Sequence, residues 1–263
     1  MKLEKKVRIK GTIRFISALH IGSGREGESL SNMGVLLDPA GNPILPGSTL
    51  KGKFRASSEK IAHAMALTAC MMDKGLSGVE CITDEGYRKQ MIDNFRTLAD
   101  SRKKLVWVEE HTCNICQLFG SPLQAGRIFF NDGELVEDTW PGVIQTRDGV
   151  VIDRDSERAR DGGKYNFDVV PAGIEFKIGI ELINPLESEL ALSGAVVHEW
   201  QEGATLGGFS SRGLGRFVMR DVTVKQLDFL DPAQRLAALL GKGWQDVGIT
   251  LLDSALQSVV ATV

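Results

Sequence analysis

The first regular pattern in the chain is an alternation of apolar and polar residues between positions 7 and 15. The apolar set is Val7, Ile9, Ile13 and Phe15, and the set between them is Arg8, Lys10, Thr12 and Arg14. A period of two residues is typical of a strand with one buried face. We therefore predict a strand with a basic solvent face here. The same alternation predicts a second strand at Ile174, Phe176, Ile178, Ile180 and Leu182.

Other segments have the spacing of helices. In residues 50–69, the apolar positions near one helical face are Leu50, Phe54, Ile61 and Met65. Ser48 or Thr49 is placed to cap the start of this helix. Further helices are predicted over residues 86–104 and 187–201, and the region 230–257 is also expected to be helical. Residues 35–47 contain Asp-Pro and Gly-Asn pairs, which favour a hairpin or loop.

The order of the predicted elements indicates the fold class. Short strands at residues 126–132 and 217–224 complete a βαββαβ order, which predicts an α+β fold with a ferredoxin-like or RNA-recognition-type palm. Residues 144–171 combine many charges and glycines with few apolar side chains, so we expect a projecting hairpin or mobile loop there. Residues 70–116 are predicted to be an insertion, and the palm then comprises residues 1–69 and 117–263.

Composition limits the class of protein. The chain has 263 residues, of which 43% are hydrophobic and 25% are charged, as in ordinary globular proteins. It contains no run of about 18 apolar residues. Its basic start lacks the apolar stretch of a signal peptide. We therefore expect a soluble cytoplasmic protein with no membrane partner.

The formal net charge of −3 argues against a nucleic-acid binder until it is divided along the chain. Residues 1–60 contain eleven Lys and Arg against five Asp and Glu, a net charge of +6, so the other 203 residues carry −9. A basic segment is typical of an anion-binding face, because a polyanion responds to the local field. A solvated charged surface would give the same count.

The four cysteines predict a structural metal site. Cys113 and Cys116 have the Cys-x2-Cys spacing that lets two thiolates bind one tetrahedral ion, for which zinc is favoured. The other expected ligands are Cys70 and Cys81, with His63 and His111 as alternatives. Cys70 lies in the apolar run ALTACMM, where a small buried side chain without a metal is the competing interpretation. A closed site of four ligands has no catalytic role.

Two segments are candidates for anion binding. At the predicted helix start, Ser48, Thr49 and free backbone amides lie beside cations; these are Lys51, Lys53 and Arg55. The Gly-rich segment GGFSSRGLGRF offers amides together with Ser211 and Arg212. Solvated lysines and a tight turn at Gly213 and Gly215 are the simpler interpretations. The segment does not match a nucleotide-binding P-loop. No Ser/His/Asp or Cys/His catalytic set is recognisable, and His20 has no evident partner.

Five motifs occur in a characteristic order over residues 7–225. They are HIGSG, LPGSTLKGKFR, CNICQLFGS, VIDRDSERARDGGKYNFDVVPAG and GGFSSRGLGRF. Together they resemble the RAMP superfamily, and in particular the repeated backbone subunits of type III CRISPR effector complexes. The resemblance implies a palm, a zinc-binding finger over residues 70–116 and a protruding β-thumb over residues 144–171.

The resemblance also implies partners and binding residues. Guide CRISPR RNA, complementary target RNA, other effector subunits and further copies of this chain are the expected partners. Base pairing would supply sequence specificity, while the protein recognises shape and phosphate. The residues assigned to RNA are His20, Ser48, Lys51, Lys53, Arg55, Arg147, Arg154, Ser211 and Arg212.

The family's target cleavage uses an aspartate shortly before a Val-x-x-Asp-Pro stretch. Aligning VLLDP on that stretch brings Asn32 to the position, while a shifted alignment nominates Glu28 or Glu26. An amide carries no negative charge for a divalent cation such as Mg²⁺, which only a cleaving chain would need. Natural loss and deliberate inactivation would leave the same residue.

Two other functions remain open from the sequence. A guide-processing endoribonuclease of the same superfamily would need a His-based site, for which His20 is the candidate. A non-enzymatic, zinc-containing assembly subunit would show no salt-dependent affinity for RNA.

Overall fold

The computed structural model describes residues 2–22 and 33–262. Its centre is an antiparallel sheet with the strand order β2-β6-β1-β8-β7, to which β3 and β9 are added beside β6 and β8. The strands are β1 (Lys5–Phe15), β2 (Ile128–Phe130), β3 (Glu134–Leu135), β6 (Glu175–Ile183), β7 (Ala204–Thr205), β8 (Arg216–Asp228) and β9 (Gln245–Asp246). Helix α1 (Gly47–Ala62) joins β1 to β2, and α6 (Glu187–Glu202) follows β6. This arrangement confirms the predicted ferredoxin-like palm.

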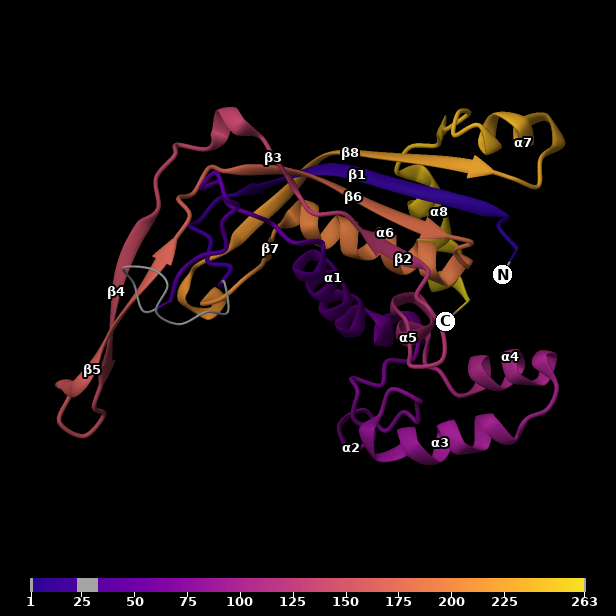
Figure 1. Cartoon of the computed structure of the whole chain (residues 1–263), viewed down its shortest axis with the longest axis horizontal. Helices are drawn as coiled ribbons and strands as arrows, with labels where there is room; N and C mark the ends of the chain where they lie inside the picture. The colour runs from indigo at the N-terminus through magenta and orange to yellow at the C-terminus, as the bar shows by residue number, and fades with distance from the viewer. Residues whose placement is uncertain (1, 23–32, 263) are drawn as a thin grey trace.

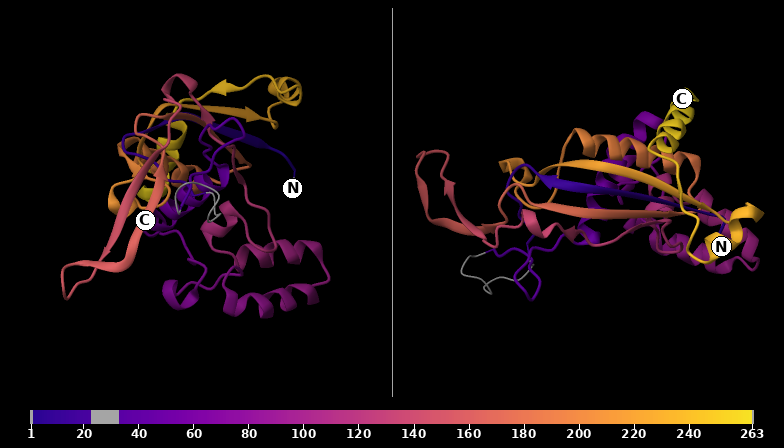
Figure 2. Two further views of the ribbon diagram at one scale, coloured as in Figure 1. Left: turned by 60° about the vertical axis from the view of Figure 1, so that its left-hand side comes forward. Right: turned by 90° about the horizontal axis from the view of Figure 1, so that it is seen from above.

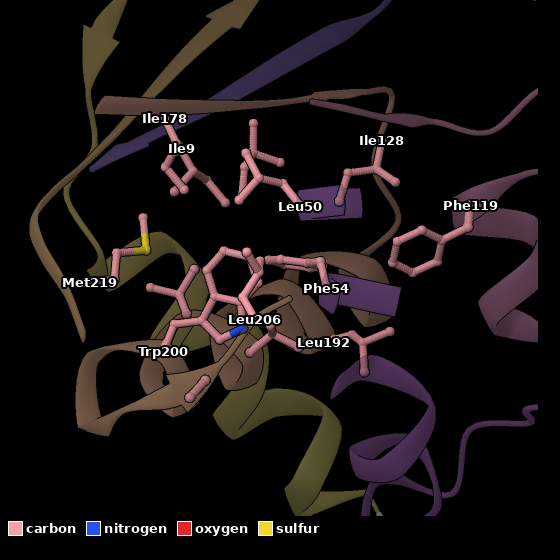
Figure 3. Close-up of a cluster of buried hydrophobic side chains, with 14 of the residues drawn as sticks. Ile9, Leu50, Phe54, Phe119, Ile128, Ile178, Leu192, Trp200, Leu206 and Met219 are labelled. Atoms are coloured by element: carbon pink, nitrogen blue, oxygen red, sulfur yellow. The ribbon is translucent and has the colours of Figure 1, made fainter. Parts of the chain in front are cut away.

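The core lies between the sheet and the helices that cover one of its faces, α1, α6 and α8 (Thr250–Ala261) (Figure 1). The alternation in β1 puts its apolar set on that face, and Val7, Ile9, Ile13 and Phe15 are fully buried. Figure 3 shows Phe54 of α1 and Trp200 of α6 in the middle of this layer, where their rings meet edge to face at 5.3 Å. Burial of large aromatic rings in this geometry stabilises the contact between helices and sheet.

The opposite face of the sheet is charged, as predicted, and three of its cations form ion pairs. The antiparallel register places Arg8 of β1 across from Glu181 of β6, and the two side chains meet at 2.9 Å. Lys6 binds the other oxygen of the same carboxylate at 2.9 Å, and Arg14 lies 3.6 Å from Glu175. Two carboxylates that are distant in sequence therefore offset part of the charge of the basic strand face, which also carries the exposed Lys10.

Residues 144–171 contain a two-stranded hairpin, β4 (Gln145–Ile152) and β5 (Ala159–Val169), which extends away from the palm (Figures 1 and 2). We call it the thumb. Its base is anchored where Phe167 and Val169 pack with Ala18 and Leu214 in a small separate cluster. Nearly all of β4 is exposed to solvent, so the outer part of the hairpin is stabilised mainly by the pairing of β4 with β5.

Residues 70–116, which we call the finger, lie at the other end of the palm (Figures 1 and 2). They contain α2 (Lys74–Ser77), α3 (Glu85–Thr97), α4 (Ser101–Glu110) and the start of α5 (Asn114–Phe119). The single helix predicted over residues 86–104 is wrong. Leu98 is extended, and the Asp100 carboxylate accepts a hydrogen bond from the Arg102 amide, which starts a new helix. The finger cysteines nevertheless belong to the same hydrophobic core as the palm.

The ends of α1 also differ from the prediction. The helix begins at Gly47, and neither Ser48 nor Thr49 caps it, because the Gly47 amide donates instead to Asp132 Oδ1 at 2.7 Å. Asp132 follows β2 and lies 85 residues away in sequence. The helix ends at Ala62 and a single 3-10 turn follows (His63–Met65), closed by Ala66 in the left-handed region.

The C-terminal region is not one continuous helix. It contains α7 (Pro232–Leu239), the short β9 and α8, separated by residues with positive φ that include Gly241 and Gly243. Short 3-10 turns complete the fold at Glu137–Thr139 and Ser210–Arg212. In the part of the chain that the structure describes, no helix has the length and apolar character needed to span a membrane.

Candidate metal centre and nucleic-acid interface

The four cysteines meet in one buried cluster between the finger and the palm. The four sulfur atoms of Cys70, Cys81, Cys113 and Cys116 all lie within 4.8 Å of one another. Cys113 is the N-cap of α5 and Cys116 lies in its first turn, so the Cys-x2-Cys spacing places both thiols at one helix end. Cys70 and Cys81 come from the loops around α2. The predicted meeting of these four residues is confirmed.

The cluster has the dimensions of a tetrahedral thiolate site. Four sulfurs bound at about 2.3 Å to a central zinc ion would be about 3.8 Å apart. The Cys70 and Cys116 sulfurs are 3.6 Å apart and no disulfide joins them. Neither histidine alternative is part of the cluster. His63 is exposed, and His111 donates from Nδ1 to the Trp107 carbonyl at 2.8 Å while stacking on the Trp107 ring.

Hydrogen-bond donors surround the sulfurs. The amides of Met72, Cys113 and Cys116 each point at a sulfur at 3.4 Å, namely those of Cys70, Cys81 and Cys113 respectively. The Thr83 hydroxyl lies 3.0 Å from Cys70 Sγ and 3.2 Å from the sulfurs of Cys81 and Cys116. Such donors orient thiolate ligands and stabilise their charge.

The crowding of four thiols separates their pKa values. A hydrogen bond from Cys113, with a second from Cys116, lowers the pKa of Cys70 to about 6. Hydrogen bonds to Cys116, Cys70 and Cys81 raise the pKa of Cys113. Hydrogen bonds within the cluster therefore favour the thiolate at Cys70 and the thiol at Cys113, and a metal ion would displace the protons that remain.

The predicted anion site at the start of α1 is only partly available. Ser48 is exposed and Lys51 and Lys53 are half-buried; burial lowers the pKa of both lysines, and the charge of Arg55 adds to this effect at Lys51. The first amide of the helix is already bound by Asp132. An anion at this site would therefore meet the two lysines and the Ser48 hydroxyl rather than a set of free backbone amides.

Arg55 follows Lys51 by one turn of α1, but its side chain has different partners. Its Nε donates to Glu59 Oε1 at 2.9 Å, and its Nη2 donates to Cys116 Sγ at 3.3 Å. Its side chain is 18% exposed. The structure therefore brings this residue to the cysteine cluster, a contact that sequence reasoning missed because the two residues are 61 positions apart.

The Gly-rich segment and the base of the thumb form a second site. The Arg212 guanidinium donates to the Tyr165 hydroxyl of β5, and Phe209 stacks on Phe167 with ring centroids 4.4 Å apart. A groove of about 710 Å³ opens here, lined by these four residues together with Met33, Asp148, Gly149, Val150 and Val151. Aromatic faces beside an arginine suit stacking and phosphate contacts. Gly215 has φ +70, and a Cβ there would collide with the Leu206 carbonyl, so the tight-turn interpretation of this glycine also holds.

His20 lies beside this groove but is buried, with 6% of its surface exposed. Its Nδ1 donates to the Asp168 carbonyl at 2.7 Å, and its own carbonyl accepts from the Gly208 amide at 2.8 Å. These contacts give His20 a role in joining the Gly-rich segment to the base of the thumb.

The remaining predicted residues fall on or near the thumb. Arg147 lies on β4, Arg154 in the turn between the strands, and Ser211 in the 3-10 turn of the Gly-rich segment; all three are exposed. Asn32, Glu28 and Glu26 lie outside the described residues. Met33, which follows Asn32, accepts a hydrogen bond from the Asp168 amide at 2.9 Å and lines the groove.

Comparison with known proteins agrees with this architecture. A model of the RAMP superfamily matches residues 12–218, a span that includes the cysteine cluster, the thumb and the Gly-rich segment. The chain is 25% identical over 234 residues to the protein of Methanocaldococcus jannaschii named CRISPR system Cms endoribonuclease Csm3, covering 84% of this chain and 82% of that one. It is also 25% identical over 229 residues to a protein of the same name from Enterococcus italicus, covering 85% and 95%.

Proposed function

The chain belongs to the RAMP superfamily, and we propose that it is a Csm3-like backbone subunit of a type III CRISPR ribonucleoprotein. In this role it binds guide RNA and organises the duplex between guide and target RNA. The observation that carries the proposal is the match of residues 12–218 to the superfamily, supported by the two relatives named Csm3. Further copies of the chain and other effector subunits would be its protein partners.

The palm would hold the guide by its phosphates. Lys51 and Lys53, with the exposed Ser48, supply charge and a hydrogen-bond donor in the first turns of α1. Arg212 and Ser211 supply a second contact in the Gly-rich segment. Phosphate contacts of this kind position RNA without reading its sequence, which base pairing between guide and target would supply.

The thumb would act on the duplex. It projects from the palm, and β4 exposes three consecutive apolar residues, Val150, Val151 and Ile152, each between 46% and 53% exposed. Arg147 and Arg154 lie on the same hairpin. An apolar strand flanked by cations is suited to enter a duplex and displace a base pair while it remains close to phosphates.

The four cysteines would hold one zinc ion with a structural role. A closed set of four thiolates leaves no open position for a substrate, so the ion would contribute folding energy. It would fix the loops around α2 to the first turn of α5.

Position 32 would decide whether this chain cleaves target RNA. An aspartate there could bind Mg²⁺ and assist attack of a ribose 2′-hydroxyl on the adjacent phosphate, whereas the Asn32 amide has no negative charge for either task. We therefore propose a subunit that binds RNA and leaves the target intact.

The test assembles the complex with guide RNA, complementary target RNA and Mg²⁺, using either this chain or Asn32→Asp. Cleavage by the Asn32→Asp chain alone is expected. Equal cleavage by both chains would overturn the assignment of position 32.

A parallel titration measures guide RNA affinity against salt concentration. A phosphate-binding subunit should lose affinity steeply as salt rises. An assembly subunit that contacts only proteins would show no such affinity, and that result would overturn the proposed RNA binding.

A further inference from the structure

The position of Arg55 in the cysteine cluster becomes clear when the N–H donors to each sulfur are counted, apart from the Thr83 hydroxyl that lies near three of them. Among the described residues, Cys70, Cys81 and Cys113 each accept one backbone N–H, from Met72, Cys113 and Cys116 respectively. The fourth sulfur, that of Cys116, accepts its N–H from the Arg55 guanidinium at 3.3 Å. With this side chain, each of the four sulfurs has one N–H donor.

We propose that Arg55 is a positioning residue of the metal centre: its guanidinium supplies the fourth N–H donor to the thiolates and links palm helix α1 to the finger. The inference rests on the proposed zinc site. It assigns Arg55 to metal binding in place of the RNA contact expected from the family resemblance.

The electrostatics of the site favour a cation here. Four thiolates around a divalent ion carry a net charge of −2, which is costly in a buried site unless donors and cations compensate it. All four cysteines are buried. Arg55 is the cation that directly contacts one of its sulfurs in the described part of the chain.

The surroundings of Arg55 hold its side chain in place. Glu59, one turn later on α1, binds Nε at 2.9 Å, and both side chains are less than 20% exposed. The guanidinium carbon lies 5.9 Å from the centre of the Phe119 ring, and Phe119 belongs to α5 like Cys116. The planar guanidinium thus contacts an acid on one helix and a sulfur and a ring on the other, a geometry that lysine cannot reproduce.

The backbone conformation next to Cys70 supports a role for the N–H donors at the site. Met71 and Met72 both have positive φ, 50° and 61°, which residues with side chains seldom adopt. This turn directs the Met72 amide at Cys70 Sγ. The chain thus adopts an unfavourable backbone conformation that brings one N–H donor to a sulfur. This supports the interpretation that the contact between Arg55 and Cys116 also has a role at the site.

The test measures metal binding and RNA binding separately on the full chain. Zinc affinity is determined by competition with a chromogenic chelator for the unmodified chain, Arg55→Met and Lys60→Met. Lys60 lies on the same helix, is exposed and does not contact the cluster. We expect Arg55→Met to bind zinc about 10- to 100-fold more weakly, the usual cost of removing a partner of a metal ligand, and Lys60→Met to bind normally.

A spectroscopic readout separates a donor role from simple packing. With Co²⁺ as the probe, the sulfur-to-metal charge-transfer band should shift in Arg55→Met and Arg55→Lys. It should stay unchanged in Glu59→Gln, which keeps the contact between Arg55 and Cys116. If Arg55→Met does not fold, Arg55→Lys carries the same comparison with the charge retained.

The outcomes distinguish this inference from the proposed function. Unchanged zinc affinity and an unchanged Co²⁺ band in the Arg55 variants would overturn the inference. A smaller salt dependence of RNA binding together with normal metal binding would instead assign Arg55 to RNA. Failure of the unmodified chain to bind zinc would overturn the metal site itself, independently of Arg55.

Discussion

The cysteine cluster and the thumb, at opposite ends of the palm, are stabilised in opposite ways. In the cluster, four buried sulfurs lie within 4.8 Å of one another and each has an N–H donor. In the thumb, seven of the eight residues of β4 are exposed, and only the base joins a hydrophobic cluster. Single substitutions should therefore destabilise the cluster even without RNA, whereas substitutions in the outer thumb should have an effect only when RNA is present.

The largest effect is expected at the cluster. Cys113→Ser should abolish binding of the proposed zinc ion and lower the free energy of unfolding by several kcal/mol, because structural zinc sites contribute directly to folding. Metal analysis and urea unfolding measure both changes. His111→Asn is the matched control, since His111 is outside the cluster, and it should keep the ion. Unchanged metal content in Cys113→Ser would refute the site.

In its sensitivity to substitution, the base of the thumb should resemble the cysteine cluster more than it resembles the thumb tip. Phe167 is 8% exposed and stacks on Phe209, so Phe167→Ala should cost about 3 kcal/mol of stability through loss of buried ring surface. Val151→Ala on exposed β4 is the control and should change stability by less than about 0.5 kcal/mol. Thermal unfolding compares them, and equal losses would contradict the separation of base and tip.

Lys51 tests whether the palm acts through phosphate contacts. Lys51→Met should weaken guide RNA binding about tenfold, as expected for one charged hydrogen bond. It should also reduce the slope of log affinity against log salt by about 0.7, the value for one contact to single-stranded RNA. Lys60→Met, at the far end of the same helix, should leave the slope unchanged. An unaltered slope in Lys51→Met would exclude a phosphate contact at this residue.

The charged sheet face should contribute a smaller, pH-dependent effect. Burial raises the pKa of Glu181, but hydrogen bonds from Lys6 and Arg8 outweigh it, so the pKa is lowered below its ordinary value of 4.5. The stabilisation is therefore present above pH 4.5 and lost as the pH falls through the lowered value. Glu181→Gln should cost about 1 kcal/mol or less at pH 7, given solvent screening. This difference from the unmodified chain should shrink in acid; a constant difference would contradict it.

The smallest effect on stability per substituted residue is expected at the exposed apolar strand of the thumb. Replacing Val150, Val151 and Ile152 with serine should change the free energy of unfolding by less than about 0.5 kcal/mol per residue. The same variant should reduce the fluorescence rise of 2-aminopurine placed at the base pair that the thumb displaces. Serine at Leu236, Leu239 and Leu240, on and just after exposed α7, is the control. A normal fluorescence rise in the thumb variant would remove the wedge role.

Local patterns predicted most of the fold. Strands β1 and β6 could be predicted from the two-residue period of a half-buried strand. The approach of Cys113 and Cys116 could be predicted from their Cys-x2-Cys spacing. Local patterns failed where neighbouring groups compete. The helix predicted over residues 86–104 is broken because Asp100 caps a new helix, and the predicted Ser48 or Thr49 cap is replaced by Asp132, which approaches from another element.

The βαββαβ order, the hairpin, the four thiols and the family resemblance could all be recognised in the sequence, because each depends on periodicity, composition or the order of motifs along the chain. The partner of each charged group, in contrast, is set by the packing of segments in space. Arg55 contacts a sulfur rather than solvent, Arg8 contacts Glu181, and Asp132 takes the first amide of α1. Coulomb and hydrogen-bond energies depend on distance and burial in space, and folding sets both by joining segments far apart in sequence.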